Sequence, residues 1–467
     1  MRSTFFGLDI AYRALQAQQQ AIDVVSHNIA NASTPGYSRQ TAILAATLPF
    51  GTPSVTWDAG PGQMGTGVEV IDVRRARYGF LDRQIQNELQ TLGQWEKMRD
   101  ALKQVEAVLN EPSDSGLNSL LSKFWQSWQD LSSAPQDAGA RRALVEQAES
   151  LASGFQHTYA QLTEIRRDLD RQIVLGSARI NDLAQQIASL NVRISQVETL
   201  GQRANDLRDQ RDLLLDELSR LARVTYYETP EGAINVFLGN RMLVFRDRAE
   251  QLSIEYDSDK FATIVWDSDG NPISGTSGEL YGLQQARDVR LPQIVAELDE
   301  LAGQIIVSVN AIHRIGFGLD NSTGLDFFLG SGLEDVVVNP DLKSNPERVA
   351  AAGASDSPGD NAVALAIARL QRDRTMDGGT TDFGGFLASL VSRLGVDCRR
   401  ADVTANNQKL IVDHLDRQRE SVSGVSLDEE ATRLIQYQRA YEAAARIVNA
   451  VDEMLNKLIN DTGLVGR

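Results

Sequence analysis

INDLAQQIASLNVRISQVETLGQRANDLRDQRDLLLDEL, residues 180–218, contains the strongest helical pattern in the chain. Its apolar residues recur at alternating steps of three and four, which places them on one face of a helix: Ile180, Leu183, Ile187, Leu190, Ile194 and Val197. Gly201 interrupts the pattern, and Asn205 or Asp206 can cap a second helix that runs to residue 221. We therefore predict an antiparallel helical hairpin over residues 160–221.

Both ends of the chain also follow a helical pattern. Residues 4–30 form one predicted helix, and a second one begins after Ser426-Leu427-Asp428-Glu429, a sequence typical of a capping box. Each helix has a heptad-like apolar stripe. The stripes consist of Phe5, Leu8, Leu15, Ile22 and Ile29 at the first end, and of Leu427, Leu434, Tyr441, Val448, Leu455 and Ile459 at the other. We predict that the two terminal helices pair as a coiled coil.

The C-terminal helix has a second apolar stripe beside the first, formed by Ile447, Val451, Met454 and Leu458. An apolar surface this wide needs more than one partner helix. Ordinary packing within a bundle accounts for the 160–221 hairpin. For the terminal helices, we expect neighbouring copies of the chain to complete the burial, which points to polymerisation.

The segment NIANASTPGYSRQ, residues 28–40, ends the first terminal helix. Proline disfavours helix at the residue before it, and Pro-Gly favours a type II turn with glycine at positive φ. A simple helix stop would account for this pattern locally. We expect the turn also to direct the chain toward an outer body, with Tyr37 and Arg39 available to a neighbouring subunit. The motif comprises Asn31, Thr34, Pro35, Gly36, Tyr37 and Arg39.

The rest of the chain alternates helical segments with short β segments. A strand is predicted within residues 65–78, and antiparallel strands within 224–275, where turn signals separate aromatic and β-branched runs. A short strand is expected at 335–338. Helices are predicted at 80–109, at 117–131, from 138, and at 280–312, 361–372, 383–394 and 404–422.

The predicted fold class is mainly α with a small β insert. It consists of an elongated multi-helix bundle, paired terminal helices and an antiparallel β outer domain. We expect residues 1–34 and 423–467 to form a terminal assembly domain. The helical body would comprise 35–223 and 276–422, and the inserted β domain 224–275.

Charge and composition exclude several classes of function. The 467 residues carry a net charge of −17, which argues against a nucleic-acid surface and against a polybasic membrane surface. Cys398 is the single cysteine, so an intramolecular disulfide and a thiolate zinc site are excluded. No apolar run is long enough to span a membrane, and the start lacks the apolar core of a cleaved signal peptide.

Motifs for catalysis, metal binding or cofactor binding are weak, and we predict no such site. Residues 60–65 match the glycine spacing of a dinucleotide loop but lack a preceding strand and a following helix. Asp267, Asp269 and Asn271 have calcium-loop spacing, yet Pro272 and Gly278 occupy the positions that need Gly and Glu, so a hairpin turn is favoured. The histidines lie far apart in the sequence: His27, His157, His313 and His414.

Several stretches resemble the axial proteins of the bacterial flagellum. ANASTPGYSRQ (30–40) and the segment 435–460 resemble the two end signatures of rod, hook and hook-associated proteins. Three further stretches resemble the hook-associated protein 1 family: residues 5–31, residues 65–85 and, above all, 180–218. The segment 423–434 also fits that family. The match is poorest in 224–275 and 316–346, and the chain is short for the family, so its outer domain is expected to be small.

The resemblance implies a structural, non-enzymatic subunit of the hook–filament junction that is needed for filament assembly. Copies would form a ring-like zone, a homo-oligomer, between the hook protein and hook-associated protein 3. The family is exported through the flagellar type III apparatus without a cleaved signal, so the chain would be cytoplasmic only transiently. Before export, a cytoplasmic chaperone would cover the C-terminal helix.

Two other functions stay open at this point. The end signatures also permit a hook or distal-rod subunit, although those proteins usually have more β structure and less long helix than the 160–221 hairpin indicates. A cytoplasmic enzyme or a helical adaptor with a ligand in the β insert is the alternative from a different class. No motif favours it.

Overall fold

The computed structural model describes residues 5–49, 64–109, 116–273 and 277–460. Contacts divide the chain into two compact units. The first unit comprises Met1–Leu89, Ile180–Gln251 and Leu410–Arg467, and the second comprises Gln90–Arg179 and Leu252–Lys409. Within the described part of the chain, none of the helices combines the length and apolar character that a membrane span requires.

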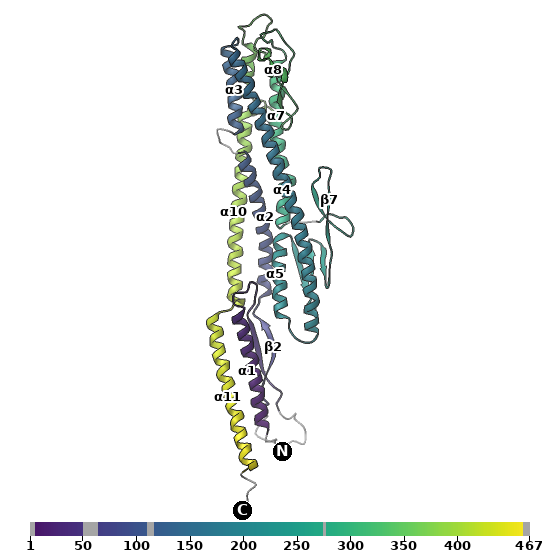
Figure 1. Ribbon diagram of the computed structural model, residues 1–467, viewed down its shortest axis with the longest axis vertical. Coiled ribbons are helices and arrows are strands. Elements are labelled where there is room, and N and C mark those ends of the chain that lie inside the picture. Colours follow the sequence, from purple (N-terminus) through teal and green to yellow (C-terminus); the bar gives the residue numbers. More distant parts are fainter. Residues whose placement is uncertain (1–4, 50–63, 110–115, 274–276, 461–467) are drawn as a thin grey trace, which may run out of the picture. The chain divides into compact units, whose positions relative to one another are not determined.

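The two terminal helices pair within the first unit, as predicted. Helix α1 (Phe6–Ala30) lies beside helix α11 (Leu427–Asn460) and runs antiparallel to it (Figure 1). A Cβ placed on Gly7 would lie 3.6 Å from Cγ2 of Val451, and at the other end the Asn28 amide contacts Glu430. The two ends of the sequence therefore meet from Gly7 to Asn28 on α1 and from Glu430 to Val451 on α11.

A β-hairpin follows α1 in the sequence and packs against it. It pairs β1 (Gln40–Ala46) with β2 (Val68–Arg75) in antiparallel register, with Gln40 opposite Arg75. The second strand was predicted, but the first was not. QTAILAA has few β-branched residues, and its place in the hairpin is fixed by pairing with β2 rather than by local propensity.

The predicted helical hairpin is present, but its first helix is longer than expected. Helix α4 (Ala138–Thr199) runs without a break through the segments that we treated separately, and α5 (Asn205–Leu221) returns beside its last turns. The cap prediction is wrong, because Ala204 occupies the cap position and no side chain caps the helix. Likewise, α10 (Phe383–Ser423) is one helix where two were predicted.

The strands within 224–275 form two sheets rather than one. The first unit has a four-stranded antiparallel sheet of β3 (Val224–Glu228), β4 (Ile234–Leu238), β5 (Arg241–Phe245) and β6 (Arg248–Ala249). The second unit has a hairpin of β7 (Leu252–Tyr256) and β8 (Ala262–Trp266). The antiparallel pairing confirms the predicted β character, whereas the three-part domain division stays a prediction.

The helices of the second unit follow the sequence pattern closely. Besides parts of α4 and α10, they are α2 (Gly79–Leu109), shared with the first unit, α3 (Leu117–Ser133), α6 (Glu279–Gln285), a π-helical turn (Ala286–Arg290), α7 (Leu291–His313), α8 (Pro340–Ser344) and α9 (Ala362–Arg369). Short 3₁₀ turns occupy Pro346–Arg348 and Leu370–Arg372. The predicted strand at 335–338 is reduced to β10 (Val337–Val338), which pairs with β9 (Phe328–Leu329).

The core of the second unit includes a cluster of aromatic side chains, which we call the aromatic core. Phe124 contacts four other rings with centroid distances of 4.9–6.4 Å, and Trp125 stacks on Phe383 at 5.7 Å. All of its aromatic rings are at most 2% exposed. The cluster consists of Phe124, Trp125, Trp128, Phe327, Phe328 and Phe383.

Two weak sequence motifs can now be placed. After β8, residues 267–271 form a turn in which Gly270 has a φ of +68° and the Asn271 carbonyl accepts a hydrogen bond from Trp266, so the hairpin-turn prediction is confirmed. The glycine motif at 60–65 lies mostly outside the described residues. Among the residues that are described, no group of three or more His, Cys, Asp or Glu is placed to hold a metal ion.

Candidate functional site: the terminal helix pair and the polar clamp at its base

Small side chains, rather than the predicted apolar stripe, form the buried face of α1, which packs against α11, β1 and β2 and which we call the seam. Ala11, Ala17 and Ala21 are at most 2% exposed, and Val25 is 3% exposed. These positions lie beside the heptad-like stripe of α1. Small residues leave little bulk between two helices, so the helix axes can approach closely. The larger residues of the stripe therefore lie at the sides of the seam, where most of them are partly buried.

Three of the ten described interface residues are exposed, and the others are partly buried. Phe5, Leu427 and Tyr441 are exposed to 56%, 55% and 37%. Seven others are partly buried, namely Leu8, Leu15, Ile22, Ile29, Leu434, Val448 and Leu455. The Ile459 side chain lies outside the described residues. In the second stripe, Val451 is buried, but Ile447 and Met454 are 52% and 58% exposed.

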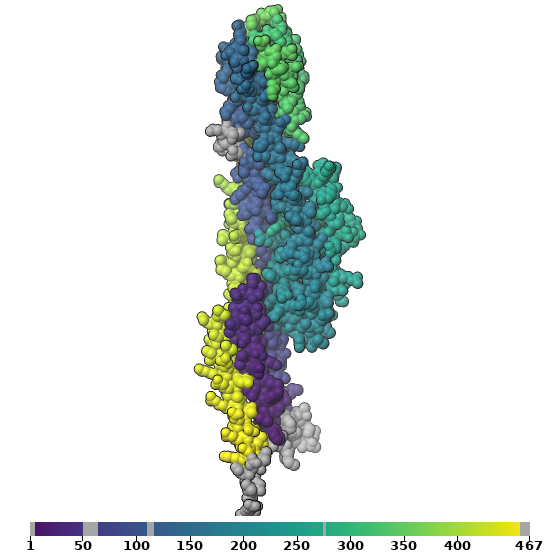
Figure 2. All heavy atoms as spheres, in the orientation of Figure 1, coloured from purple at the N-terminus to yellow at the C-terminus, as the bar shows by residue number. Residues whose placement is uncertain are grey.

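One face of the helix pair is uncovered within the first unit. In Figure 2, α1 and α11 lie against each other along their length, and the visible face of both helices is open. Apolar side chains on such a face stay in contact with water unless another molecule covers them. Ile447 and Met454 lie seven positions apart, so these two exposed apolar residues share one side of α11.

At its base, the pair is joined by a buried amide, Asn28. Asn28 Nδ2 donates to Glu430 Oε2 and to the Gln40 carbonyl, both at 2.8 Å. Asn28 Oδ1 accepts from the Tyr37 hydroxyl at 2.8 Å and from the Gln40 amide at 2.9 Å. Asn28 and Glu430 are both 0% exposed, and Arg433 pairs with the second carboxylate oxygen of Glu430 at 3.1 Å. A single side chain thus connects α1, α11, the turn and β1.

The turn after α1 has the predicted geometry. The Tyr37 amide donates to the Thr34 carbonyl at 3.2 Å, and Gly36 has a φ of +78°, as a type II turn requires. Asn31 donates to the His27 carbonyl, and Thr34 donates to Asn31.

Tyr37 and Arg39 are both engaged within the chain. Arg39 Nη1 lies 3.0 Å from Glu429 Oε2, so the acid of the predicted capping box pairs with arginine, while Ser426 Oγ accepts from the Glu429 amide at 3.5 Å. Any contact of Tyr37 or Arg39 with a neighbouring subunit stays a prediction and must coexist with these bonds.

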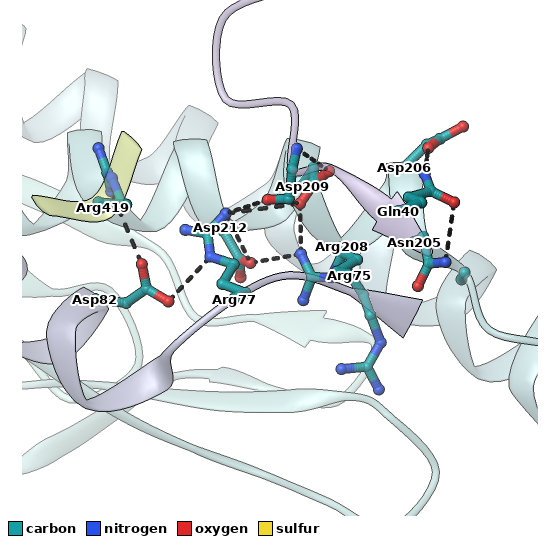
Figure 3. A network of polar contacts seen from close by, with 12 residues as sticks. Gln40, Arg75, Arg77, Asp82, Asn205, Asp206, Arg208, Asp209, Asp212 and Arg419 are labelled. Atoms are coloured by element: carbon teal, nitrogen blue, oxygen red, sulfur yellow. Dashed lines mark hydrogen bonds and ion pairs between the residues drawn. The ribbon is translucent and has the colours of Figure 1, made fainter. Parts of the chain in front are cut away.

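A network of acidic and basic side chains, which we call the polar clamp, surrounds this base (Figure 3). Asp209 on α5 is its centre. It accepts from the Ser38 amide and hydroxyl, both at 2.8 Å, and from Arg75 Nη1 at 2.6 Å. Arg75 also donates to Asp212 at 2.8 Å. The turn, β2 and α5 are therefore tied together by charge-assisted hydrogen bonds.

The clamp continues to the start of α2 and the end of α10. Arg77 Nε donates to Asp82 at 2.9 Å, and Arg419 pairs with Asp216 at 2.6 Å. Gln86 also donates to Asp216, at 3.0 Å. The clamp thus holds three arginines against four aspartates: Arg75, Arg77 and Arg419, with Asp82, Asp209, Asp212 and Asp216.

Burial and neighbouring charges shift the pKa values of the clamp. Burial raises the pKa of Asp209 and of Asp216, although Arg75 and Arg419, respectively, oppose the shift. Burial would lower the pKa of Arg77, but the nearby aspartates, Asp212 first, raise it overall. Burial, followed by Asp206, Asp209 and Glu430, raises the pKa of Tyr37, which keeps its hydroxyl as a proton donor.

The residues that we expected to cap α5 have a different role. Asn205 Nδ2 donates to Gln40 Oε1 at 3.1 Å and to the Val73 carbonyl at 2.8 Å, while Gln40 Nε2 donates to Asp206 at 2.7 Å (Figure 3). The sequence analysis did not select any of the α5 aspartates as site residues. A signal was present, because Asp209, Asp212 and Asp216 recur at helical steps of three and four.

The structure also places two of the histidines and the single cysteine. His27 lies 3.2 Å from Asp206, whereas His313 is buried in the second unit. Cys398 is 5% exposed, and burial raises its pKa to about 12, so the thiolate is suppressed at neutral pH. His313 and Cys398 are thus buried side chains of the second unit.

The terminal segments match known protein families. Residues 8–37 match the family model described as flagella basal body rod protein, and residues 418–461 match the C-terminal model of flagellar basal body rod FlgEFG proteins. These segments coincide with α1, the turn and α11. Together with the helical fold, they define the chain as a flagellar axial protein.

The central part of the chain identifies the family within this class. Residues 102–328 match the helical domain of flagellar hook-associated protein FlgK. Flagellar hook-associated protein 1 of Bacillus subtilis strain 168 is 34% identical, with 100% of both chains covered. The Salmonella typhimurium LT2 protein of the same name is 28% identical over 96% of this chain and 98% of its own length. This chain belongs to the flagellar hook-associated protein 1 family.

A solved structure supports the same fold. The flagellar hook junction protein FlgK from Burkholderia pseudomallei superposes with a TM-score of 0.65, covering 73% of this chain and 100% of that one, at 16% sequence identity. The mainly helical fold with small antiparallel sheets is therefore that of the family.

Proposed function

We propose that this chain is a structural subunit of the junction between the hook and the filament of the bacterial flagellum, and that filament assembly needs it. The observation that carries this proposal is the terminal helix pair. Its apolar side chains, such as Phe5, Ile447 and Met454, stay more than half exposed, while its base is fixed by buried hydrogen bonds. Because hydrogen bonds fix the helix pair at one end, its exposed apolar side chains are held in place for burial by neighbouring copies.

The partners that we propose are those that the family resemblance implies. Copies of the chain would form a ring-like zone, with the hook protein on one side and hook-associated protein 3 on the other. The helix pair would become more ordered on docking, because its exposed apolar residues then leave water. This assembly role requires no catalytic step and no cofactor.

We also propose that the chain is exported through the flagellar type III apparatus without a cleaved signal. Before export, α11 would be covered by a cytoplasmic chaperone, since Leu427, Ile447 and Met454 each leave more than half of the side chain exposed. The protein would thus be cytoplasmic only briefly and would reside outside the cell in the flagellum.

A deletion strain tests the proposal. Cells that lack this chain should carry hooks without filaments, and filaments should return when the full chain is supplied. Cells without any hook would instead indicate a hook or distal-rod subunit. Antibody labelling of isolated hook–basal bodies should place the chain at the end of the hook.

A pair of variants on α11 tests the surface itself. Ile447→Asp puts a charge on the exposed apolar face and should abolish incorporation, with unchanged helix content in the purified chain. Asn449→Asp, two residues further on at an exposed polar position, is the matched control and should incorporate normally. Normal filaments on cells with Ile447→Asp would contradict this use of the surface.

A further inference from the structure

The outer face of α10 in the second unit is basic and apolar, unlike the chain as a whole. None of its exposed residues between 392 and 409 is acidic, although the whole chain has a net charge of −17. The two aspartates of this segment are partly buried and paired, Asp397 with Arg290 at 3.3 Å and Asp402 with Lys103 at 2.8 Å. The exposed residues are Ser392, Arg393, Val396, Arg399, Arg400, Val403, Asn406, Asn407 and Lys409.

The centre of this face, which we call the α10 stripe, is formed by Val396, Arg399, Arg400 and Val403. The two valines are 63% and 51% exposed and lie seven residues apart, so they share one side of the helix. Neither Arg399 nor Arg400 has a salt-bridge partner among the described residues.

A groove lies on each side of Val396. One, of about 280 Å³, is bordered by Ile294 and Glu297 of α7, and the other, of about 620 Å³, by Lys103 and Glu106 of α2. The α10 stripe is thus an apolar ridge with unpaired positive charge and room for inserted side chains on both flanks.

A surface of complementary character lies on the β7–β8 hairpin of the same unit. Residues 252–273 contain five acids and one lysine, which gives a net charge of −4. At the hairpin tip, Asp257 and Asp259 are exposed next to Tyr256, whose side chain is 64% exposed. The aromatic ring can pack on the apolar ridge, and the two carboxylates have the charge opposite to that of the two arginines.

The hairpin is held firmly on its unit. The Ala262 amide donates to Asp170 of α4 at 2.8 Å, and Arg287 donates to the Ala262 carbonyl at 2.7 Å. Arg166 lies over the Phe261 ring at 3.9 Å from its centroid. In Figure 1, β7 and α10 lie on opposite sides of this unit, with α4 between them. The two surfaces therefore cannot meet within one copy.

We propose that the α10 stripe binds the tip of the β7–β8 hairpin of a second copy of this chain. Tyr256 of one copy packs beside Val396 and Val403 of the next, and Arg399 and Arg400 face Asp257 and Asp259. Because the two surfaces differ, the contact is heterologous, and its repetition joins copies into a ring or a row. This inference rests on the proposed function and supplies a lateral contact separate from the terminal helix pair.

Cross-linking in assembled flagella tests the contact directly. In a full chain with Cys398→Ser, the pair Tyr256→Cys and Val403→Cys should give a ladder of covalent multimers in hook–basal bodies treated with a short bismaleimide. Each single cysteine variant should give none. Normal incorporation without a ladder, or cross-links only to a different axial protein, would overturn the contact while leaving the proposed function intact. Loss of the unmodified chain from hook–basal bodies would instead count against the proposed function.

Charge reversal supplies an independent readout. Arg399→Glu with Arg400→Glu should lower incorporation at least fivefold, and adding Ser258→Arg with Asp259→Arg should restore at least half of it. Asp257 is kept, because its carboxylate accepts the Asp259 and Phe261 amides of the turn at 2.9 and 2.8 Å. The control, Arg372→Glu with Arg374→Glu, makes the same charge change at other exposed positions and should incorporate normally. Unchanged incorporation of the α10 variant, or loss that the hairpin changes do not repair, would refute the contact.

Discussion

The terminal helix pair and the aromatic core are both built from helices, yet they bury their large side chains differently. In the aromatic core, Trp125, Trp128 and Phe327 are at most 2% exposed, so the apolar surface is finished within one chain. In the terminal pair, alanines occupy the seam, while Ile447 and Met454 are more than half exposed. The terminal pair therefore holds itself together with small and polar contacts and leaves several bulky groups exposed, which other copies would cover under the proposed function.

Polar groups follow the same division. His313 packs against Trp128 and Phe327 of the aromatic core, and both of its ring nitrogens contact backbone: Nδ1 lies 2.7 Å from the Leu325 carbonyl, and Nε2 accepts from the Ala350 amide at 3.0 Å. At the base of the terminal pair, Asn28 instead joins segments that are distant in sequence, with Glu430 lying 402 positions away. The hydrogen bonds of His313 complete a local core, whereas those of Asn28 fix the position of the terminal helix pair.

The largest expected effect is a difference in stability loss between a variant of the aromatic core and a variant of the terminal helix pair. Trp128→Ala should lower the free energy of unfolding by about 3–5 kcal/mol, because it removes a fully buried ring. Tyr441→Ala removes a ring that is 37% exposed and should cost less than about 1 kcal/mol. Urea unfolding followed by far-UV circular dichroism measures both, and equal losses would break the comparison.

The polar base should be the most sensitive point of the terminal pair. Asn28→Ala removes the amide between Glu430 and Gln40 and leaves buried polar groups without partners. The expected cost is about 2–3 kcal/mol, confined to α1 and α11. Amide hydrogen exchange should accelerate there and not in α3. An unchanged exchange rate in both terminal helices would contradict the role of Asn28.

The aromatic core should weaken in acid through His313. Burial lowers its pKa to about 4, so the folded chain holds a neutral ring where the unfolded chain has a pKa near 6.5. Its stability contribution is therefore present above pH 6.5 and is lost as the pH falls toward 4. Between pH 7.5 and pH 5 the loss should be about 2 kcal/mol. A His313→Gln variant should lose this part of the pH dependence, and an unchanged slope would contradict the assignment.

The turn should show the smallest effect on stability. Gly36→Ala places a side chain at a φ of +78°, which costs about 1–2 kcal/mol, whereas its Cβ would meet Leu213 at an ordinary 3.5 Å. Because the turn sets how the chain leaves α1, incorporation into flagella should fall more than the melting temperature indicates. If Gly36→Ala and Gly36→Val lowered the melting temperature and incorporation in proportion, the turn would act in folding only.

Most of the fold could be predicted because its signals are local. The face of Ile180, Leu183 and Ile187 is fully buried, and the Pro35-Gly36 turn has the predicted conformation. What could not be predicted depends on pairing between distant segments. Strand β1 forms because β2 pairs with it. Asn205 does not cap α5, because its amide group donates hydrogen bonds to Gln40 and to the Val73 carbonyl instead.

The candidate site was predicted only in part for the same reason. Periodicity selects Leu15, Ile22 and Val448 as apolar stripe residues, but it does not show that Ala11, Ala17 and Ala21 fill the seam. The polar clamp requires Ser38, Arg75 and Asp209 to meet across long sequence separations. No spacing within one helix contains that information, although the aspartate repeat of α5 indicated a polar face.

Hydrogen–deuterium exchange tests most directly the claim that the terminal pair is finished by other copies. The measurement compares the amides of α1 and α11 in the isolated full chain and in purified hook–basal bodies, with α3 as the internal reference. We expect α1 and α11 to exchange much faster than α3 in the isolated chain and to become as protected as α3 after assembly. Terminal helices that are already as protected as α3 in the isolated chain, with no further change on assembly, would contradict the claim.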